Sequence, residues 1–349
     1  MVVWLCMLAT VLLAKFFMGT LDSDSSKKRF LIFVGLIVVF VAGSRYATTA
    51  GVGDINNYYR LYSRMASISF SELFSSSSME PGYLLFNKIF SLVLPWTQTI
   101  MYAVSAVCVF FSFRFIYKYC SNVFLGVLGY LSQGLFVFNL SGFRQSIAIG
   151  ICLFAIEFIQ KRKCLAFVVT VLIAMSFHST AIIFLPFYFL SKLQPSPLNL
   201  LAYAGLSVLL FNFGPELMSF GSDITGSDYD TAVVKGTLVG PLINTILYAL
   251  TLLFLGLMNK NKENDSSTKW MWNMTICGLM VYLLRFVSIP FERISFYFSG
   301  STMALLAYGF ENVCKTRSVE KNLLNMVYVI LSIALYFIRF RTIGYDFFG

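Results

Sequence analysis

Charged residues are scarce in this chain of 349 residues: they make up 12% of it, whereas hydrophobic residues make up 58%. Soluble domains carry roughly 25% charged residues, so the composition excludes a soluble globular protein. The long apolar runs indicate a polytopic membrane protein instead. Because helices in lipid pack as one co-folded bundle, a single transmembrane domain is expected over residues 1–349.

Sequence signatures for metals, disulfides and nucleotides are also missing. The seven cysteines stand alone, without a CxxC or Cys/His pairing, so neither a disulfide framework nor a metal site is predicted. No P-loop, GxGxxG, HExxH, GxSxG or EF-hand loop occurs. Asp22 and Asp24 have the spacing of a metal-binding DxD pair but lie in a Lys-rich turn. These absences count against ATP-driven transport and against a nucleotide-sugar donor.

The net charge of +10 does not indicate nucleic-acid binding. Its Lys and Arg residues fall mostly in short turns between apolar runs, and no basic amphipathic cluster of the kind that binds nucleic acid is present. The first 19 residues lack a basic n-region and an evident cleavage site, so they are expected to remain as a first transmembrane span.

Apolar runs predict an all-α bundle of about twelve transmembrane helices, since each span needs about 20 apolar residues. The expected helices are 2–19, 30–43, 98–116, 123–139, 143–160, 164–177, 179–191, 198–213, 241–258, 270–287, 294–311 and 322–339. Residues 82–94 are too few to span comfortably and are followed by Pro95, so a re-entrant or interfacial helix is expected there.

The distribution of Lys and Arg predicts the orientation, because cytoplasmic loops are enriched in both. With residues 44–83 placed outside, most cations fall inside, including the KRK run at 161–163. Both termini then lie outside, and a second outer loop is expected at 212–240. The charges at the outer rim are richer in Arg than in Lys, and the planar fork of Arg suits phosphate.

The longest polar interruption, residues 44–83, contains Arg45, Asp54, Tyr58, Glu80 and Tyr83. Asp54 follows two glycines in GVGDINNYY, which is a turn signal. Aromatic rings beside polar donors suit carbohydrate, whose apolar faces stack on rings. Tyrosines also anchor proteins at the membrane interface, and for each tyrosine the two interpretations stay equally open.

The run LSGFRQSIAIGICLFAI at 140–156 predicts a helix with Ser141 as its N-cap, Arg144 in its first turn and Gln145 next to it. A helix N-terminus favours anions. A cation there is unfavourable for the helix itself, which suggests that Arg144 is placed for an external anion. The alternative, that Arg144 extends to lipid headgroups, is equally open on spacing alone.

The only histidine, His178, lies between two apolar stretches in AMSFHSTAIIFLPFYFL at 174–190. A helix break there would set the imidazole at the outer membrane edge, where it can act as a general base. The alternative is a structural histidine bonded to a backbone carbonyl at the break, and a lone histidine more often has that role.

Three charges stand together in the run RFVSIPFERISFYFSG at 285–300, namely Arg285, Glu292 and Arg293. Glu292 is interpreted as neutralising a neighbouring arginine. Arg293 begins the apolar pattern, where an unpaired charge is unfavourable, and it is therefore a candidate for function.

Five short pieces occur in order between residues 44 and 300: SRYATTAGVGDINNYYRLY, MEPGYLLFNKIFS, GFRQSIAIGICLFAI, IAMSFHSTAIIFLPFY and RISFYF. Together they resemble the EpsG-like branch of the Wzy-type polysaccharide polymerases, while the flanking spans match only in hydrophobicity. The positions carried over by this resemblance are Arg45, Gly53, Asp54, Tyr58, Glu80, Gly82, Tyr83, Arg144, His178 and Arg293.

The resemblance implies a polymerase of lipid-linked repeat units for O-antigen, capsule or exopolysaccharide. The growing glycan on undecaprenyl diphosphate would pass to the non-reducing sugar of one lipid-linked unit, and undecaprenyl diphosphate would leave. The reaction would take place at the outer face of the bacterial cytoplasmic membrane. No metal, nucleotide or other cofactor is expected, and a separate protein is expected to regulate chain length.

This chemistry assigns roles to the candidate residues. Arg144 and Arg293 would stabilise the diphosphate leaving group, with Arg45 or Arg285 as further candidates. His178 is the first candidate for the base, ahead of Asp54 or Glu80. The residues expected to bind substrate are Arg45, Asp54, Tyr58, Glu80, Tyr83, Gln145 and Arg285.

Two other functions stay open. A flippase or other transporter of lipid-linked sugars would need charges inside the bilayer along a path, whereas the charges here gather at one rim. A membrane O-acyltransferase could use the single histidine, but it would leave the outer arginines without a role.

Overall fold

The computed structural model describes residues 1–46, 55–193, 239–259, 266–286, 290–304 and 318–347, together with positions 199, 201, 203 and 205. Its contacts divide the chain into two compact units. Unit 1 comprises residues 1–185 and 318–349, and unit 2 comprises residues 186–317.

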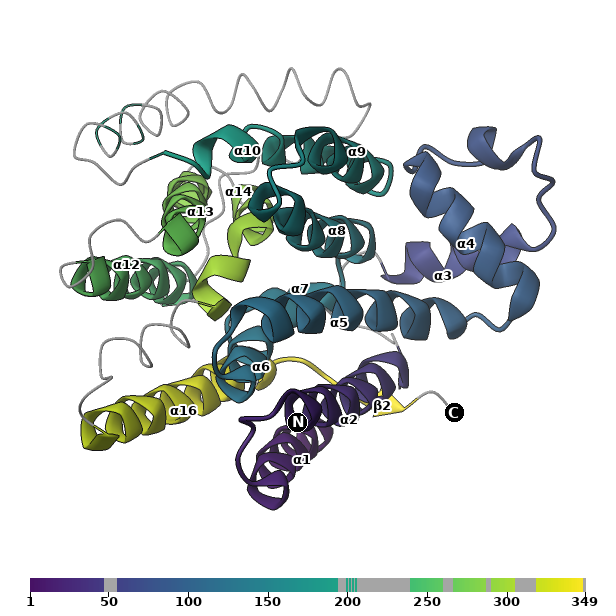
Figure 1. The fold of residues 1–349 in the computed structure, drawn as a ribbon. Coiled ribbons are helices and arrows are strands. Elements are labelled where there is room, and N and C mark those ends of the chain that lie inside the picture. The colour runs from purple at the N-terminus through teal and green to yellow at the C-terminus, as the bar shows by residue number, and fades with distance from the viewer. Residues whose placement is uncertain are drawn as a thin grey trace. The chain divides into compact units, whose positions relative to one another are not determined.

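Helices dominate unit 1 (Figure 1). The α-helices are α1 Val2–Met18, α2 Asp24–Gly43, α3 Ile55–Met65, α4 Pro81–Val93, α5 Thr99–Tyr119, α6 Val123–Ser132, α7 Leu135–Asn139, α8 Phe143–Gln160, α9 Cys164–Met175 and α16 Ser318–Phe340. Two 3₁₀ helices are η1 Leu73–Ser75 and η2 Ser179–Phe184. The short strands β1 Arg45–Tyr46 and β2 Asp346–Phe347 pair antiparallel, with Arg45 opposite Phe347.

Unit 2 is described by α10 Phe187–Leu190, α12 Val239–Asn259, α13 Ser266–Leu283, η3 Leu284–Phe286, α14 Pro290–Ser295 and η4 Phe296–Phe298. The predicted helix at 198–213 and the predicted outer loop at 212–240 lie largely outside the described residues.

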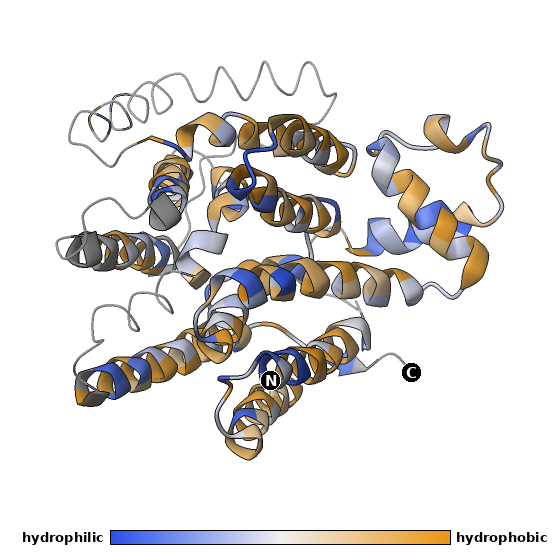
Figure 2. Cartoon of the chain, viewed as in Figure 1, coloured by the Kyte–Doolittle hydropathy of each residue, from blue (hydrophilic) through white to orange (hydrophobic). Residues whose placement is uncertain are grey.

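Among the described helices, three are long and apolar enough to cross a membrane: Thr99–Tyr119, Phe143–Gln160 and Lys321–Phe340. Shorter apolar helices are Val2–Met18, Val123–Ser132, Cys164–Met175, Ser179–Leu190 and Leu242–Leu253. Figure 2 shows hydrophobic colour along most of α5 and α8, whereas α3 carries hydrophilic segments. The chain is therefore a helical membrane protein, and the number of about twelve spans stays a prediction.

Several expected helices have the predicted bounds within a few residues, among them 2–19, 82–94 and 143–160. The helix expected at 30–43 begins earlier, at Asp24, because the Ser23 side chain caps it and accepts a hydrogen bond from the Ser26 amide at 3.1 Å.

Three expected helices are interrupted. The prediction of one helix over 294–311 is wrong, because α14 ends at Ser295 and the 3₁₀ helix η4 follows it. The prediction of one helix over 123–139 is wrong, because Gly134 adopts a left-handed φ of 108° between α6 and α7. The prediction of one α-helix over 179–191 is also wrong. This stretch forms η2 and the single turn α10, with Pro186 between them, and proline has no amide hydrogen to continue a helix.

Helix α5 packs against both α2 and α8, and α8 packs against α9. Glycines permit two of these close approaches. A Cβ on Gly35 of α2 would lie 3.4 Å from Val109 Cγ1, and one on Gly150 of α8 would lie 3.1 Å from Phe111 Cβ. The antiparallel pair α8 and α9 brings the start of α8 beside the end of α9, and the candidate site lies there.

Candidate active site

Glu80 lies at the start of α4, where the backbone leaves an extended conformation and enters the helix at Pro81. Proline is favoured at this first helical position because its fixed φ suits a helix and its missing amide hydrogen would be unpaired anyway. The Glu80 side chain does not cap its own helix. It extends instead toward the loop that follows α9.

His178 occupies the break that the sequence predicts. Helix α9 ends at Met175, the His178 backbone is extended, and η2 begins at Ser179. The His178 amide still donates to the Ala174 carbonyl at 3.0 Å, which fixes the position of the residue after the last turn of α9. The predicted helix break is therefore confirmed.

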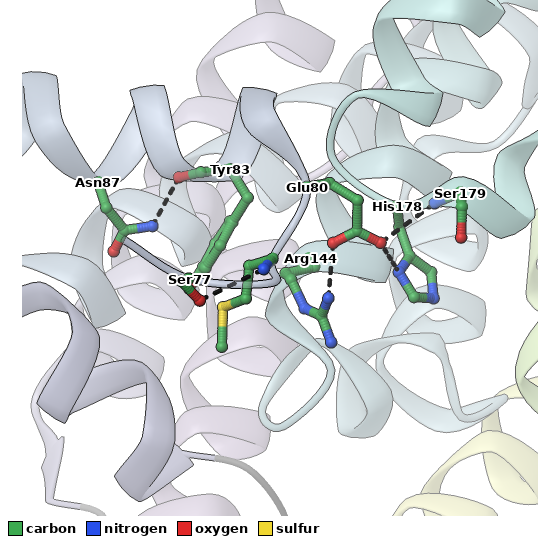
Figure 3. Close-up of polar contacts among 8 residues, drawn as sticks. Ser77, Glu80, Tyr83, Asn87, Arg144, His178 and Ser179 are labelled. Carbon is green, nitrogen blue, oxygen red and sulfur yellow. Dashed lines mark hydrogen bonds and ion pairs between the residues drawn. The ribbon is translucent and has the colours of Figure 1, made fainter. Parts of the chain in front are cut away.

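The Glu80 carboxylate joins three elements (Figure 3). Its Oε2 lies 2.5 Å from Arg144 Nη1 in the first turn of α8. Its Oε1 lies 2.9 Å from His178 Nδ1 and accepts a hydrogen bond from the Ser179 amide at 3.2 Å. These three side chains are 14–25% exposed, so the cluster is half-buried and open on one side.

The charges and hydrogen bonds of the cluster determine the ionisation of Glu80 and the tautomer of a neutral His178. Burial acts to raise the pKa of Glu80, but the hydrogen bond with His178 and the charge of Arg144 outweigh it and hold this pKa at about 2. An ionised carboxylate only accepts hydrogen bonds. His178 Nδ1 therefore donates to Glu80, and in a neutral imidazole the free lone pair is on Nε2. Among the described residues Nε2 has no hydrogen-bond partner.

Gly82 permits the close contact that sets this geometry. Its amide donates to the Ser176 carbonyl at 2.7 Å. A Cβ at this position would lie 2.7 Å from the same carbonyl oxygen and 2.9 Å from the carbonyl carbon. Only glycine therefore lets the first turn of α4 lie against the end of α9, two residues from Glu80 and from His178.

Aromatic rings support the start of α8. The Tyr58 ring of α3 stacks on Phe143 at 4.8 Å, with an angle of 14° between the ring planes, and Tyr83 of α4 contacts Tyr58 edge-on at 5.6 Å. Tyr58 is 3% exposed and Tyr83 is 0% exposed. Burial raises the pKa of the Tyr83 phenol well above its usual value. Tyr58 therefore packs against the residue that precedes Arg144, and Tyr83 packs against Tyr58.

Arg45 is almost fully buried and donates through Nη2 to the Leu140 carbonyl, just before α8. Burial lowers the pKa of Arg45 to about 10, which leaves the guanidinium charged at neutral pH. Gln98, also buried, donates to the carbonyls of Gly43 and Arg45 and accepts from the Tyr59 hydroxyl. Arg45 thus holds the backbone that leads into α8.

Of the remaining candidates, one lies at the start of α8, two lie in unit 2 and one lies outside the described residues. Gln145 is buried beside Arg144. Arg285 pairs with Glu292 at 2.5 Å, which confirms that Glu292 neutralises a neighbouring arginine. Arg285 and Arg293 belong to unit 2 and are described within it alone. Asp54 lies outside the described residues.

One prediction about the start of α8 is wrong. The N-cap is Gly142, with no side-chain cap, and the Ser141 hydroxyl lies 3.5 Å from the Phe138 carbonyl instead. The predicted position of Arg144 in the first turn is confirmed.

A second ion cluster lies at the other end of α8. Glu157, with a side chain 5% exposed, pairs with Arg114 at 2.8 Å, Lys118 at 2.8 Å and Lys161 at 3.6 Å. Since 13 residues separate Arg144 from Glu157 and a helix rises about 1.5 Å per residue, the two clusters are roughly 20 Å apart.

Sequence reasoning missed Lys88 of α4, which is 3% exposed. Its Nζ donates to the carbonyls of Met65, Ala66 and Ile68 at 2.9, 3.2 and 2.6 Å and so closes the end of α3. The signal that could have identified it is the presence of a lysine within the apolar run GYLLFNKIFSLVL. In the described part of the chain, no group of three or more His, Cys, Asp or Glu side chains could hold a metal ion.

The fold and the site define a helical membrane protein with a carboxylate, a histidine and an arginine joined at one end of a long apolar helix. The EpsG family model matches residues 28–348, and the chain belongs to the EpsG family. This family is related to the Wzy-type polymerases, and membership indicates a glycan polymerase-like function in exopolysaccharide synthesis. No curated protein and no solved structure matches the chain.

Proposed function

We propose that the chain polymerises lipid-linked oligosaccharide repeat units at the outer face of the bacterial cytoplasmic membrane. The donor is the growing glycan on undecaprenyl diphosphate, and the acceptor is a single repeat unit on the same lipid carrier. The observation that carries this proposal is the Glu80 carboxylate, which holds His178 through Nδ1 and Arg144 through Nη1.

His178 is the proposed general base. Glu80 orients the imidazole, and Nε2 takes the proton from a hydroxyl of the acceptor's non-reducing sugar. The hydroxyl oxygen then attacks C1 of the donor's first sugar. The bond between C1 and the diphosphate oxygen breaks, and its electron pair leaves with undecaprenyl diphosphate. Glu80 is a weak base because its pKa is about 2, so it serves as the orienting group.

Arg144 is the proposed stabiliser of the leaving group. The negative charge that develops on the diphosphate needs preorganised donors, and Arg144 has N–H groups beyond the one that Glu80 accepts. Its Nε is buried and has no hydrogen-bond partner among the described residues. The position of Arg144 at the N-terminus of α8 adds backbone N–H groups and the positive end of the helix dipole.

The two ends of α8 support the proposed sidedness. At about 1.5 Å per residue, its 18 residues extend about 27 Å, close to the roughly 30 Å of a bilayer core. The Glu157 cluster holds Arg114, Lys118 and Lys161, and such cations favour the cytoplasmic side. The Glu80 cluster then lies at the exterior side.

Other assignments form part of the same proposal. Arg293 would act with Arg144 on the diphosphate, and Asp54, Gln145 and Arg285 would bind substrate. Tyr58 and Arg45 would contribute through the start of α8, against which they pack or hydrogen-bond. Tyr83 would contribute through Tyr58, which it contacts edge-on. The lipid-linked substrate and a chain-length regulator are the partners that this function requires, with no metal or nucleotide.

The test is deletion of the gene in its host, followed by complementation and gel analysis of the glycan. Deletion is expected to leave single repeat units. His178→Ala and Arg144→Ala, at normal membrane levels, should leave the units unextended, whereas Arg341→Ala, an exposed control, should restore the ladder. A ladder of normal length from both site variants would overturn the assigned roles. Units that accumulate at the inner face would indicate a flippase, and a loss of all glycan would indicate an earlier step.

A further inference from the structure

A pocket of about 530 Å³ lies between α3 and the segment that precedes Glu80. It is lined by Asn57, Arg60, Leu61, Arg64, Ser77 and Met79. Its volume is within the range of roughly 300–1,000 Å³ that is typical of small-ligand sites. Met79 directly precedes Glu80, so one wall of the pocket is continuous in the chain with the catalytic cluster.

Among the residues that the structure describes, the two arginines of the pocket have no acidic partner. Arg60 and Arg64 are four residues apart and share one face of α3, where like charges repel. Arg60 donates to the Asn57 side chain at 2.9 Å and to the Asn56 carbonyl at 3.4 Å. In the described part of the chain, the Arg64 guanidinium has no hydrogen bond or ion pair. The fold therefore gains nothing evident from this pair of charges.

The rest of the lining suits a sugar. Leu61 is buried and Met79 is half-buried, which gives the pocket an apolar floor. Asn57 and Ser77 offer polar groups at its edge, and the Ser77 hydroxyl accepts a hydrogen bond from the Met79 amide at 3.3 Å. Apolar patches beside hydrogen-bonding groups match the two kinds of surface that a pyranose presents.

Helix α3 links the pocket to the site. Its inner face carries Tyr58, which stacks on Phe143 next to Arg144. Its outer face carries Asn56, Asn57, Arg60, Ser63 and Arg64, all exposed and all polar. A face without apolar side chains is unsuited to insertion among lipid tails, and binding of lipid headgroups would require no concave floor. These features favour a polar, anionic group that stays in the aqueous phase outside the lipid.

We propose that the pocket binds a sugar of the repeat unit that carries an anionic group, either a carboxylate or a phosphate substituent. The inference rests on the proposed polymerase function and narrows its substrate to acidic glycans. Arg60 and Arg64 would form charge-assisted hydrogen bonds with the anionic group. The sugar ring would lie on Leu61 and Met79, which positions the neighbouring sugar near His178.

The test uses the full chain in proteoliposomes and repeat units extracted from the deletion strain. Extension is measured with native units, with units whose carboxylates are chemically reduced to alcohols, and with phosphatase-treated units. We expect R60Q/R64Q to raise KM for native units at least tenfold with little change in kcat. The treatment that removes the anion should raise KM equally for the wild type and have no further effect on R60Q/R64Q. R60K/R64K should recover part of the affinity.

Three outcomes would overturn the inference: a repeat unit with only neutral sugars, wild-type KM in R60Q/R64Q, or an equal loss on native and neutralised units. The last outcome would indicate headgroup contacts or a structural role. His178→Ala in the same assay separates the two proposals. If the wild type itself leaves the units single, the proposed function fails, and if His178→Ala extends them normally, the role assigned to His178 fails. If His178→Ala is inactive while R60Q/R64Q behaves as wild type, only the pocket inference fails.

Discussion

The two ends of α8 carry the same kind of cluster with different members. At each end a carboxylate bridges nitrogen-bearing side chains, and at each end the helix contributes the charge that its dipole disfavours: Arg144 at the N-terminus and Glu157 at the C-terminus. Glu157 is paired with two lysines and one arginine. Glu80 is paired with one arginine and the only histidine.

This difference separates a cluster that orients the helix from one that can perform chemistry. Lys and Arg stay protonated at neutral pH, so the Glu157 cluster has no group to exchange a proton. The Glu80 cluster has His178 Nε2 and Arg144 Nε, neither of which has a hydrogen-bond partner among the described residues. A cluster that leaves donors and acceptors unused is one that can still bind a substrate.

The largest expected effect comes from neutralising each carboxylate. Glu80→Gln should lower the rate of chain extension by about 10²- to 10⁴-fold, because the general base loses its orienting partner. Glu157→Gln should keep a rate per folded molecule within about threefold of the wild type, although less protein reaches the membrane. Both variants are measured in the proteoliposome assay after normalisation to folded protein. Equal losses would show that the two clusters have the same role.

A smaller effect concerns pH and stability. The pKa of Glu80 is about 2, below the usual carboxyl value of 4.5. Because the pKa of Glu80 is lower in the folded state, its ionisation stabilises the fold. This contribution to the free energy of unfolding, at most about 3 kcal/mol, is fully present above pH 4.5 and is lost as the pH falls toward 2. The difference in melting temperature between wild type and Glu80→Gln should persist from pH 7 to 5.5, where Glu80 stays ionised, and should narrow below pH 4.5. A difference that vanishes between pH 7 and 5.5 would contradict this.

The smallest effect is a displacement of Glu80 without loss of its charge. In Gly82→Ala the new Cβ would meet the Ser176 carbonyl, so the start of α4 must move away from the end of α9. We expect extension to fall about tenfold, which corresponds to roughly 1.4 kcal/mol, at unchanged membrane levels. Gly344→Ala is the matched control, because its backbone is not left-handed and nothing lies within 4 Å of its added Cβ. An unchanged rate in Gly82→Ala would show that the contact does not set the geometry.

Sequence alone predicted the components of the site but not their connection. Glu80 and His178 were both candidates for the base. Because their sequence positions differ by 98, the sequence gives no indication that they form a hydrogen bond. Periodicity placed α8 and the break at His178 because long apolar runs and polar interruptions are local signals. The pairing of Glu80 with Arg144 and His178 depends on how α4, α8 and α9 pack, which local signals do not contain.

Burial was the other property that sequence could not supply. Tyr58, Tyr83 and Arg45 read as surface residues of a polar loop, yet all three are at most 3% exposed. The packing of α3 and α4 against α5 and α8 determines that these side chains are buried. Lys88 holds the end of α3 in place by donating to carbonyls at and just after its last residue. The interruption at Gly134 was missed because only its left-handed φ marks it.

The most direct test of the account is a double-variant cycle on Glu80 and His178, with the rate of extension as the readout. If Glu80 acts by orienting His178, Glu80→Gln should slow the wild type by at least about a hundredfold and should have almost no effect in the His178→Ala background. Losses that multiply in the double variant, or a normal ladder from His178→Ala, would contradict a polymerase site built on this pair.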